Sequence, residues 1–270
     1  MRLEASRTMN KILSAAETIA SARRTRTPLP PLNADIAPQD EATGYLVQAA
    51  LADILSPDFG PQVGYKIGCT STVMQQYLNI PHPCGGSVYG HGVHESGASL
   101  DYKKFVRVGV ECEIAVRMAH DLAPSSSPFT ADWVARAIEA YLPAIEIVDD
   151  RYTDWQMIGA PTLVADDFFA AGCVLGEPIA RSAALDLMQV VGRAIINGDE
   201  VARGTGADVL GHPHNALAWL ANHLAASGKG LHAGQIVLTG SLVKTVWLGM
   251  GDKVVMDLSG LGAVTVDFRG

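Results

Sequence analysis

The apolar positions of this chain follow two spacings, one near its N-terminus and another in the remainder. Residues 8–23 and about 40–55 place Ala, Ile and Leu at helical intervals, which predicts two helices. A proline-rich stretch separates them, and Ser56-Pro57 is expected to end the second. The sequence therefore predicts an N-terminal helical arm.

Beyond this arm the pattern changes to short apolar and β-branched runs, which are typical of strands. Expected strands lie around Lys66 and over residues 108–117, 235–238, 253–258 and 263–268. The last two alternate in polarity, and the glycines of residues 259–262 predict a hairpin between them. The larger part of the chain is therefore expected to be β-rich.

Three further helices and one long loop complete the expected elements. The helices are expected over residues 72–78, 130–141 and 211–226. A capping box of Thr72 and Gln75 would begin the first, and Ser227-Gly228 would stop the last. Residues 79–99 are rich in Gly, Pro and His and are expected to form a loop.

Composition and charge narrow the class of protein. The chain has 270 residues, 48% of them apolar, enough for a sizeable core. A formal net charge of −8 without a basic run argues against nucleic-acid binding. No stretch has the length of a membrane span, and the N-terminus shows no signal pattern. The four cysteines are widely spaced, so a cytoplasmic protein with reduced thiols is expected.

Paired carboxylates supply the strongest candidate chemistry. Glu111 and Glu113 point to the same face of an expected strand because side chains alternate along it. Adjacent carboxylates repel one another unless a cation or a shared proton neutralises them, and such oxygens suit Mg²⁺ or Mn²⁺. Glu146, between Ile145 and Ile147, would complete an oxygen cage. The alternative is the solvated face of an antiparallel sheet.

Other polar residues allow competing interpretations. Lys66 either extends to solvent or enters a site as a charge stabiliser or proton carrier. A zinc site from the histidines and Cys84 of residues 79–99 has no standard spacing and is disfavoured. Asp166-Asp167 interrupts a buried run, so at least one acid is expected to have a partner. The Gly204-Thr-Gly206 segment lacks the rest of a nucleotide fingerprint.

Several ordered motifs together carry a family resemblance. They lie at residues 64–71 with Met74 and Gln76, 111–113, 142–146 with Arg151 and Trp155, 210–213 with Asn215, 238–240 and 261–262. With these motifs the chain resembles the 2-oxopent-4-enoate hydratase/4-oxalocrotonate decarboxylase branch of the fumarylacetoacetate hydrolase superfamily. The resemblance covers the chain from about residue 40 to its end.

The resemblance implies an α+β, β-rich fold, a mixed β-roll or sandwich with an N-terminal helical arm. Residues 1–60 would form the arm and residues 61–270 the metal-binding catalytic domain, together one compact unit. It also implies one Mg²⁺ or Mn²⁺ per subunit, a small 2-oxo acid as substrate and a homo-oligomer, without a nucleic-acid or membrane partner.

The resemblance also assigns roles to individual residues, by motif position. The metal ligands would be Glu111, Glu113 and Glu146. Lys66 would be the active-site lysine, and the substrate-binding residues would be Thr239, Ser241 and Arg151. Cys84 occupies the place of an acid implicated in proton transfer in characterised hydratases, so it is assigned to the catalytic set.

Two departures from the family pattern affect the expected reaction. A thiol at Cys84 is not a like-for-like proton carrier, since its reference pKa is near 8.5. Residues 165–169 read Ala-Asp-Asp-Phe-Phe where the family often has Ala-Asp-Asn and small polar residues. Two rings there would change the shape of the pocket.

The expected activity is that of a metal-dependent lyase, 2-keto-4-pentenoate hydratase-like, adding water through a metal-bound enolate. A 4-oxalocrotonate-type decarboxylase is the nearest alternative, because CO₂ loss leaves its electrons on the same enolate. An acylpyruvate-type carbon–carbon hydrolase is a further one, although His94 and Glu95 would point to opposite faces of an extended segment. A non-catalytic 2-oxo acid-binding relative is the last.

Overall fold

The computed structural model describes residues 2–182 and 184–270, and within them the strands form two mixed sheets. The larger sheet contains β1 (Gln62–Gly68), β2 (Cys84–Tyr89), β3 (Val93–Glu95), β5 (Val108–Met118), β6 (Ile138–Asp149), β7 (Ala170–Leu175), β8 (Ile179–Ala180), β11 (Ile236–Ser241) and β12 (Val246–Trp247). The smaller contains β4 (Ala98–Asp101), β9 (Val191–Ile196), β10 (Asp199–Thr205), β13 (Lys253–Leu258) and β14 (Gly262–Arg269).

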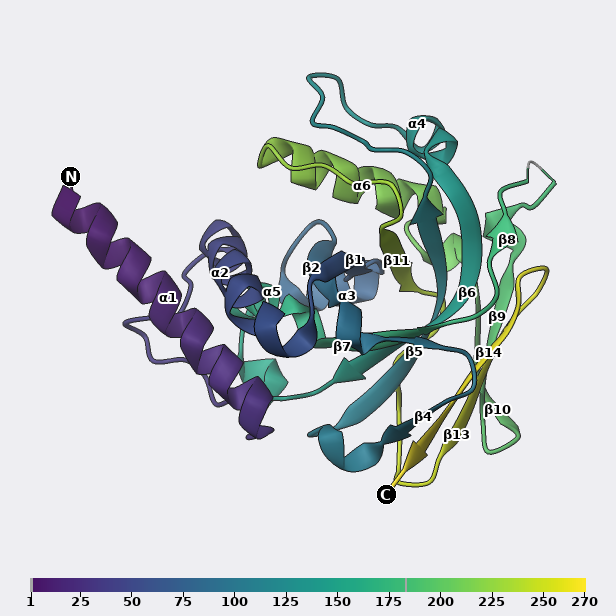
Figure 1. Ribbon diagram of the computed structural model, residues 1–270, viewed down its shortest axis with the longest axis horizontal. Coiled ribbons are helices and arrows are strands. Elements are labelled where there is room, and N and C mark those ends of the chain that lie inside the picture. Colours follow the sequence, from purple (N-terminus) through teal and green to yellow (C-terminus); the bar gives the residue numbers. More distant parts are fainter. Residues whose placement is uncertain (1, 183) are drawn as a thin grey trace.

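The strand orders place β5 and β6 in the middle of the larger sheet. That order is β2-β1-β11-β5-β6-β7-β3, with β12 beside β5 and β8 beside β6. The smaller sheet runs β10-β9-β13-β14-β4. Figure 1 shows the smaller sheet on one side of β5 and β6 and the N-terminal helices at the far end of the molecule. The predicted β-rich α+β fold is confirmed.

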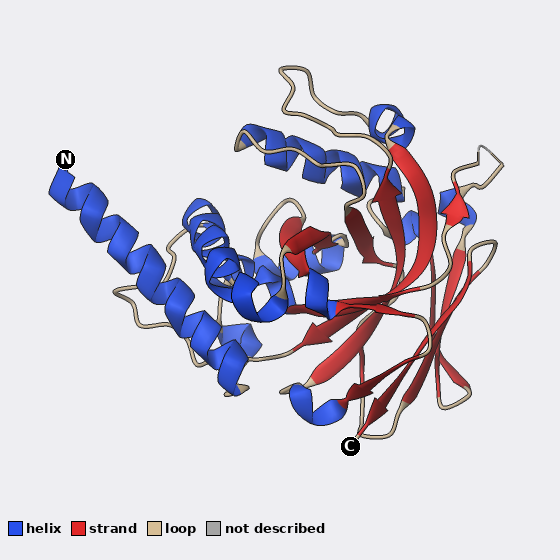
Figure 2. Cartoon of the chain, viewed as in Figure 1, coloured by secondary structure: helices blue, strands red, loops and turns tan. Residues whose placement is uncertain are grey.

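Helices gather away from the smaller sheet (Figure 2). They are α1 (Arg2–Thr25), α2 (Glu41–Phe59), α3 (Thr72–Leu78), α4 (Ala131–Arg136), α5 (Ala160–Ala165) and α6 (Pro213–Ala226). None of the described helices has the length and apolar character needed to cross a membrane.

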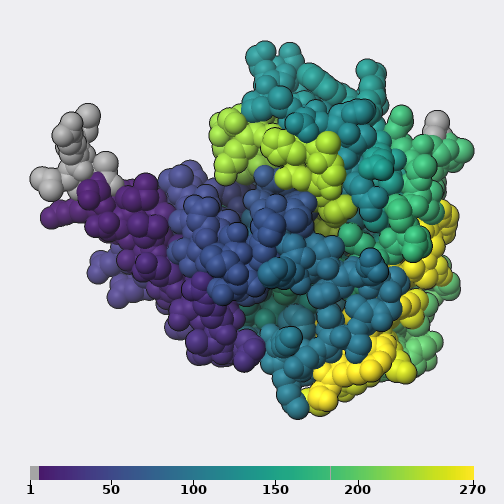
Figure 3. All heavy atoms as spheres, in the orientation of Figure 1, coloured from purple at the N-terminus to yellow at the C-terminus, as the bar shows by residue number. Residues whose placement is uncertain are grey.

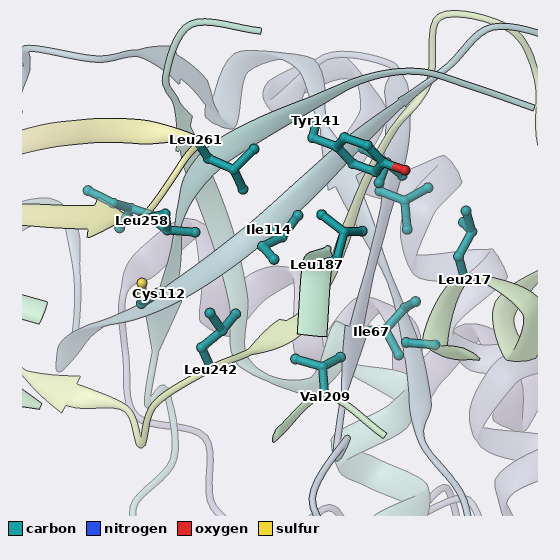
Figure 4. Packing of buried hydrophobic residues seen from close by; sticks show 14 of the residues in the cluster. Ile67, Cys112, Ile114, Tyr141, Leu187, Val209, Leu217, Leu242, Leu258 and Leu261 are labelled. Atoms are coloured by element: carbon teal, nitrogen blue, oxygen red, sulfur yellow. The ribbon is translucent and has the colours of Figure 1, made fainter. Parts of the chain in front are cut away.

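The main core lies between the two sheets, on one face of β5. Cys112 and Ile114 point into it and are fully buried. Figure 4 shows both among Leu242, Leu258 and Leu261. Because side chains alternate along a strand, the residues between them turn to the opposite face. The same core packing that buries Cys112 and Ile114 therefore directs Glu111 and Glu113 away from the core between the sheets.

A second core joins the N-terminal helices to the body. Ile19 of α1, Leu51 of α2 and Leu163 of α5 are fully buried in it. Burying one such side chain contributes about 1.5–3 kcal/mol. Figure 3 shows α1 along one edge of the molecule, against α2. The predicted helices are present, while the domain division at residue 60 stays a prediction.

Helix α2 corrects the predicted stop at Ser56-Pro57, because it continues to Phe59 and contains Pro57. A proline in the last turn removes only one backbone donor, and Leu55 remains fully buried in the second core. The helix ends instead at Gly60, whose φ of 80° and N–H bond to the Ser56 carbonyl form the cap.

Three other local predictions need correction. The cap of α3 is Ser71, which accepts from the Met74 N–H, rather than Thr72. Residues 79–99 contain strands β2 and β3 and are not one loop. Thr130 does cap a helix, but α4 ends at Arg136 because the following residues enter the central strand β6.

Candidate metal centre

Three carboxylates meet on the face of the larger sheet opposite the main core. Antiparallel pairing of β5 and β6 sets Glu111 directly across from Glu146, and Glu113 follows two residues along the same face. One ligand oxygen from each lies within 4.8 Å of the others. Glu113 and Glu146 are buried and Glu111 is partly buried. The structure therefore brings together the three glutamates that the sequence singled out.

The hydrogen bonds of these carboxylates are incomplete. Glu113 Oε2 accepts the Gly240 N–H at 2.8 Å, and the Thr245 hydroxyl donates to Glu111 Oε1. Glu113 Oε1 and both oxygens of Glu146 are buried without a hydrogen-bond donor. Buried acceptors without donors are costly and rare, so these three oxygens point to a missing partner.

Gly240 reaches Glu113 because β11 carries a bulge at this point. The register with β5 shifts between Leu238 and Ser241, and Gly240 has a φ of 116°. A Cβ at this position would lie 2.5 Å from the Thr70 side chain. Only glycine therefore permits both this backbone conformation and this close approach.

Lys66 enters the cluster from β1, where it is buried. Its Nζ lies 2.9 Å from Glu146 Oε1 as an ion pair, without hydrogen-bond geometry, and donates to the Phe168 carbonyl at 3.1 Å. Burial by itself lowers the pKa of the ammonium, but Glu146 and Glu111 outweigh it and raise that pKa. Lys66 is thus a fixed positive charge beside three acids.

Excess negative charge changes the acids themselves. Burial, with Glu146 adding to it, raises the pKa of Glu111 to about 7 against the lowering effect of Lys66. Burial, Glu146 and Glu111 raise the pKa of Glu113 well above its ordinary value. Three carboxylates share one ammonium, so a divalent cation would relieve their repulsion.

The donor set fits a hard divalent ion. Carboxylate oxygens are the ligands that Mg²⁺ and Mn²⁺ prefer, and three of these oxygens lack hydrogen bonds. Among the described residues, these glutamates are the only group of three or more His, Cys, Asp or Glu side chains arranged to hold a metal. Within the described residues, the histidines of residues 79–99 therefore belong to no such group that could hold zinc.

Two cavities adjoin the cluster, and Lys66 lines both of them. One, of about 610 Å³, is lined by Lys66, Glu111 and Ser241 together with rings that include Trp155 and Phe168. The other, of about 590 Å³, is lined by Lys66 and Glu146 and extends toward the end of α1. The first joins carboxylate, ammonium and hydroxyl groups to an apolar wall, as a site for a small organic acid requires.

The predicted substrate-binding residues lie in different surroundings. The Ser241 side chain lines the 610 Å³ cavity. Thr239 is fully buried, and its hydroxyl donates to the Ile114 carbonyl at 2.7 Å. Arg151 lines the other cavity but binds Asp166 and the carbonyl of Ala170. The arrangement supports Ser241 as a substrate contact more directly than Thr239 or Arg151, whose roles stay predictions.

Cys84 is not part of the cluster. It opens β2 opposite Gly68, is fully buried and lines neither cavity. Burial, with a contribution from Cys69, raises the pKa of its thiol, so the thiol stays protonated. The structure gives the predicted proton-carrier role no support, because a neutral thiol with a raised pKa is a poor acid and no base.

Four contributors to the site were missed by sequence reasoning. They are Thr245, the Gly240 N–H, the Phe168 carbonyl and Arg23 of α1. The first three act through single atoms in loops or bulges, which leave no periodic pattern. A signal did exist for Arg23, since buried Asp166-Asp167 required a cation, and Arg23 binds both acids.

Known proteins are similar to this chain in sequence and in architecture. The chain matches the fumarylacetoacetate (FAA) hydrolase C-terminal family over residues 72–269. It is 33% identical over 260 residues to a 2-keto-4-pentenoate hydratase of Paraburkholderia phymatum, spanning 96% of this chain and 98% of that protein. A 2-hydroxyhexa-2,4-dienoate hydratase of Comamonas testosteroni is 35% identical over 208 residues, 76% of this chain and 78% of the relative.

A solved structure extends the similarity to three dimensions. The 4-oxalocrotonate decarboxylase from Pseudomonas putida G7, complexed with magnesium and adipate, has a TM-score of 0.90 at 27% identity. The similarity covers 96% of this chain and 98% of that one. The resemblance inferred from the motifs is thus confirmed at the level of family and fold. Because the family match spans most of the chain, this protein belongs to the fumarylacetoacetate hydrolase family.

Proposed function

We propose that this protein is a divalent-metal-dependent lyase that hydrates small 2-hydroxydienoate acids, in the manner of a 2-keto-4-pentenoate hydratase. The observation that carries the proposal is the buried cluster of Glu111, Glu113 and Glu146, in which three oxygens lack a hydrogen bond and one of these is ion-paired with Lys66. Support comes from the hydratases that are 33% and 35% identical to the chain.

The three glutamates would hold one Mg²⁺ or Mn²⁺. When bound, such an ion acts as a Lewis acid toward the carboxylate and 2-oxo oxygens of a 2-oxo acid. Similar structures support a divalent ion, since the decarboxylase neighbour is complexed with magnesium in one crystal and with calcium in another. The oxygen ligands favour Mg²⁺ or Mn²⁺ over softer metals.

Lys66 would stabilise negative charge on the substrate and transfer a proton. Its ammonium is held between Glu146 and the Phe168 carbonyl at the wall of the cavity. There it stabilises negative charge that develops on a substrate oxygen, and its N–H can donate or return a proton. Ser241 would contact the substrate at the same wall, and its hydroxyl otherwise donates to the Cys112 carbonyl at 3.4 Å.

The proposed reaction has two steps, ketonisation and then addition of water. The 2-hydroxydienoate loses its 2-hydroxyl proton and gains one at C5, which gives a conjugated enone. Water then adds its oxygen at C4 and a proton at C3, which gives a 4-hydroxy-2-oxo acid. The apolar wall that includes Trp155 and Phe168 keeps other water away from the diene.

A 4-oxalocrotonate-type decarboxylase is the second candidate. Two observations favour it: the TM-score of 0.90 to such an enzyme and the thiol of Cys84 where hydratases carry an acid. Both reactions need the same stabilised negative charge on the 2-oxo group, so the cluster serves either one.

Turnover of 2-hydroxypenta-2,4-dienoate by metal-stripped protein, with and without Mg²⁺ or Mn²⁺, tests the proposal. We expect metal-dependent formation of 4-hydroxy-2-oxopentanoate. A protein that binds one equivalent of metal but gives no product from this acid would contradict the hydratase assignment. In that case release of CO₂ from 4-oxalocrotonate would identify the second candidate.

We also propose that the protein is a cytoplasmic homo-oligomer. Exposed apolar side chains on the helical arm support self-association, because Met9 and Leu13 of α1 and Leu46 of α2 are 55%, 42% and 56% exposed. Light scattering would give the mass in solution, and a monomer would contradict the oligomer.

A further inference from the structure

The segment that touches Lys66 has an unusual backbone. Asp167, Phe168 and Phe169 have φ angles of 53°, 51° and 69°, in the left-handed region, and none is glycine. Consecutive non-glycine residues rarely adopt this conformation, and they keep it only where the surroundings hold them. This left-handed turn, residues 167–169, therefore depends on its contacts.

The left-handed turn fixes the position of the lysine. The Phe168 carbonyl accepts from Lys66 Nζ at 3.1 Å, and the Phe168 ring centroid lies 5.6 Å from the same nitrogen. Phe169 packs edge-to-face on Trp155, and all three rings line the 610 Å³ cavity. A shift of this turn would move the ammonium and the cavity wall together.

An arginine from the N-terminal helix anchors the turn. Arg23 Nε lies 2.5 Å from Asp166 Oδ1, and Nη2 lies 2.7 Å from the Asp166 carbonyl oxygen and 3.1 Å from Asp167 Oδ2. Both acids are buried, as is the guanidinium. Arg151 binds Asp166 but makes no ion pair with Asp167 among the described contacts. Arg23 is thus the cation that joins both acids.

We propose that Arg23 is a positioning residue for Lys66. It acts through the Asp166-Asp167 pair and the Phe168 carbonyl, which makes the helical arm a working part of the catalytic site. The inference rests on the proposed function, in which Lys66 carries the charge and the proton. Among the described contacts, those of the Arg23 guanidinium are with Asp166 and Asp167 and not with the metal-binding carboxylates.

The neighbouring arginine supplies a matched control. Arg24 lies on the same helix and also pairs with an acid, Asp58, but these two side chains are 44% and 48% exposed. We expect Arg23→Met to lower kcat by about 10-fold to 100-fold, because a displacement near 1 Å can have that effect. KM should change less than kcat, and metal stoichiometry should stay close to wild type. Arg24→Met should leave kcat unchanged.

A double-mutant cycle separates positioning from general stabilisation. If Arg23 acts through Lys66, Arg23→Met should cause no further loss of kcat in a Lys66→Met background. Equal losses in both backgrounds would overturn the inference. Should Arg23→Met fail to fold, Arg23→Lys serves instead, since an ammonium cannot reproduce the forked contacts to both acids.

Chemical rescue gives an independent readout. Arg23 lines the 590 Å³ cavity, so a small cation from solution can approach its place. Dilute guanidinium should restore part of the kcat of Arg23→Met and none of that of Lys66→Met. Rescue of both variants alike would contradict the inference.

Amide hydrogen exchange tests the anchoring role of Arg23 whether or not the proposed function is correct. Wild-type protein without turnover on any dienoate would refute the proposed function alone. Exchange over residues 166–170 should still be faster in Arg23→Met than in wild type or Arg24→Met. Unchanged exchange in that segment would overturn the anchoring role of Arg23.

Discussion

Two buried clusters of charge adjoin one another in this protein, and they differ in balance. The metal-site cluster contains Glu111, Glu113 and Glu146 against the single ammonium of Lys66. The arginine cluster contains Asp166 and Asp167 against two guanidinium groups, those of Arg23 and Arg151. The Phe168 carbonyl connects them, because it follows Asp167 and binds Lys66.

Hydrogen bonding follows this balance, and so do the pKa shifts of Asp166 and Glu113, whereas that of Asp167 does not. Both Asp166 oxygens have donors, and Arg151 and Arg23 overcome the opposing effect of burial to lower the pKa of Asp166. Burial raises the pKa of Asp167, only partly offset by Arg23. Three oxygens of the metal-site cluster have no donor, and the pKa of Glu113 is well above ordinary. A surplus of buried acid therefore marks a site for a cation, whereas matched charges hold the fold.

The largest expected effect comes from Glu113→Gln. The variant keeps its size and the acceptor for the Gly240 N–H but loses one negative charge. We expect turnover to fall by at least about 10³-fold, the loss of several kcal/mol of charge stabilisation. Metal analysis and kinetics on the same sample would check this, and a variant that retains stoichiometric Mg²⁺ or Mn²⁺ would contradict the ligand assignment.

Lys66→Met should separate catalysis from metal binding. Loss of the positive charge and the proton donor should lower kcat by about 10²-fold, the usual contribution of a general acid or base. Metal affinity should rise, because the ammonium competes with the ion for Glu146. Calorimetric titration with Mg²⁺ would test this, and weaker binding would show that Lys66 organises the carboxylates instead.

Asp166→Asn should lower the stability of the fold and leave metal binding nearly unchanged. It leaves Arg23 and Arg151 buried with one carboxylate fewer, which we expect to reduce the free energy of unfolding by about 3–5 kcal/mol. Denaturant unfolding would measure that loss, and metal affinity should change little. Loss of metal with unchanged stability would mean that the two clusters do not divide their roles in this way.

The sequence predicted the carboxylates because their signal is local. Strand alternation alone put Glu111 and Glu113 on one face, and the flanking Ile145 and Ile147 indicated that Glu146 is buried. The register of β5 with β6, which sets Glu146 across from Glu111, was not predicted and comes from the structure. The sequence therefore identified the three carboxylates, and the structure showed how they meet.

Contacts between distant segments were not within reach. Arg23 meets Asp166 across 143 residues, and no spacing encodes that pair. Strand β2 was expected to be loop because residues 79–99 are rich in Gly, Pro and His. Its glycines serve close packing instead, since a Cβ at Gly86 would lie 2.8 Å from the Asp167 carbonyl oxygen.

The pH dependence of the stability of the metal-free protein should also reflect the surplus of acid in the metal-site cluster. The pKa of Glu111 is raised from 4.5 to about 7 in the folded state, so the folded protein binds the extra proton between these values. Stability should therefore fall as pH rises through this window, and added Mg²⁺ should restore it at the upper end. The lowered pKa of Asp166 acts oppositely, with stability lost as pH falls below its ordinary value of 3.8.

Melting curves of the metal-free protein from pH 4.5 to 8 would measure this effect. Glu111→Gln is the matched control, because it removes the titrating group while keeping an acceptor for Thr245. That variant should lose the part of the pH dependence that Glu111 contributes, and the slope that remains should reflect Glu113, whose pKa is also raised. An unchanged pH slope in the variant would assign the effect to another group.

The smallest expected effect concerns Cys84, which lies in neither cluster. Its thiol is buried with a raised pKa, so Cys84→Ala should leave kcat essentially unchanged and reduce stability by about 1 kcal/mol. Steady-state kinetics would check this, and a loss of about 10²-fold in kcat would mean that the thiol takes part in proton transfer.

Cys84→Asp completes the test, because a carboxyl there should raise hydratase activity only if this position carries protons. Increased turnover in Cys84→Asp together with unchanged turnover in Cys84→Ala would mean that the position can support proton transfer but that the native thiol takes no part in it.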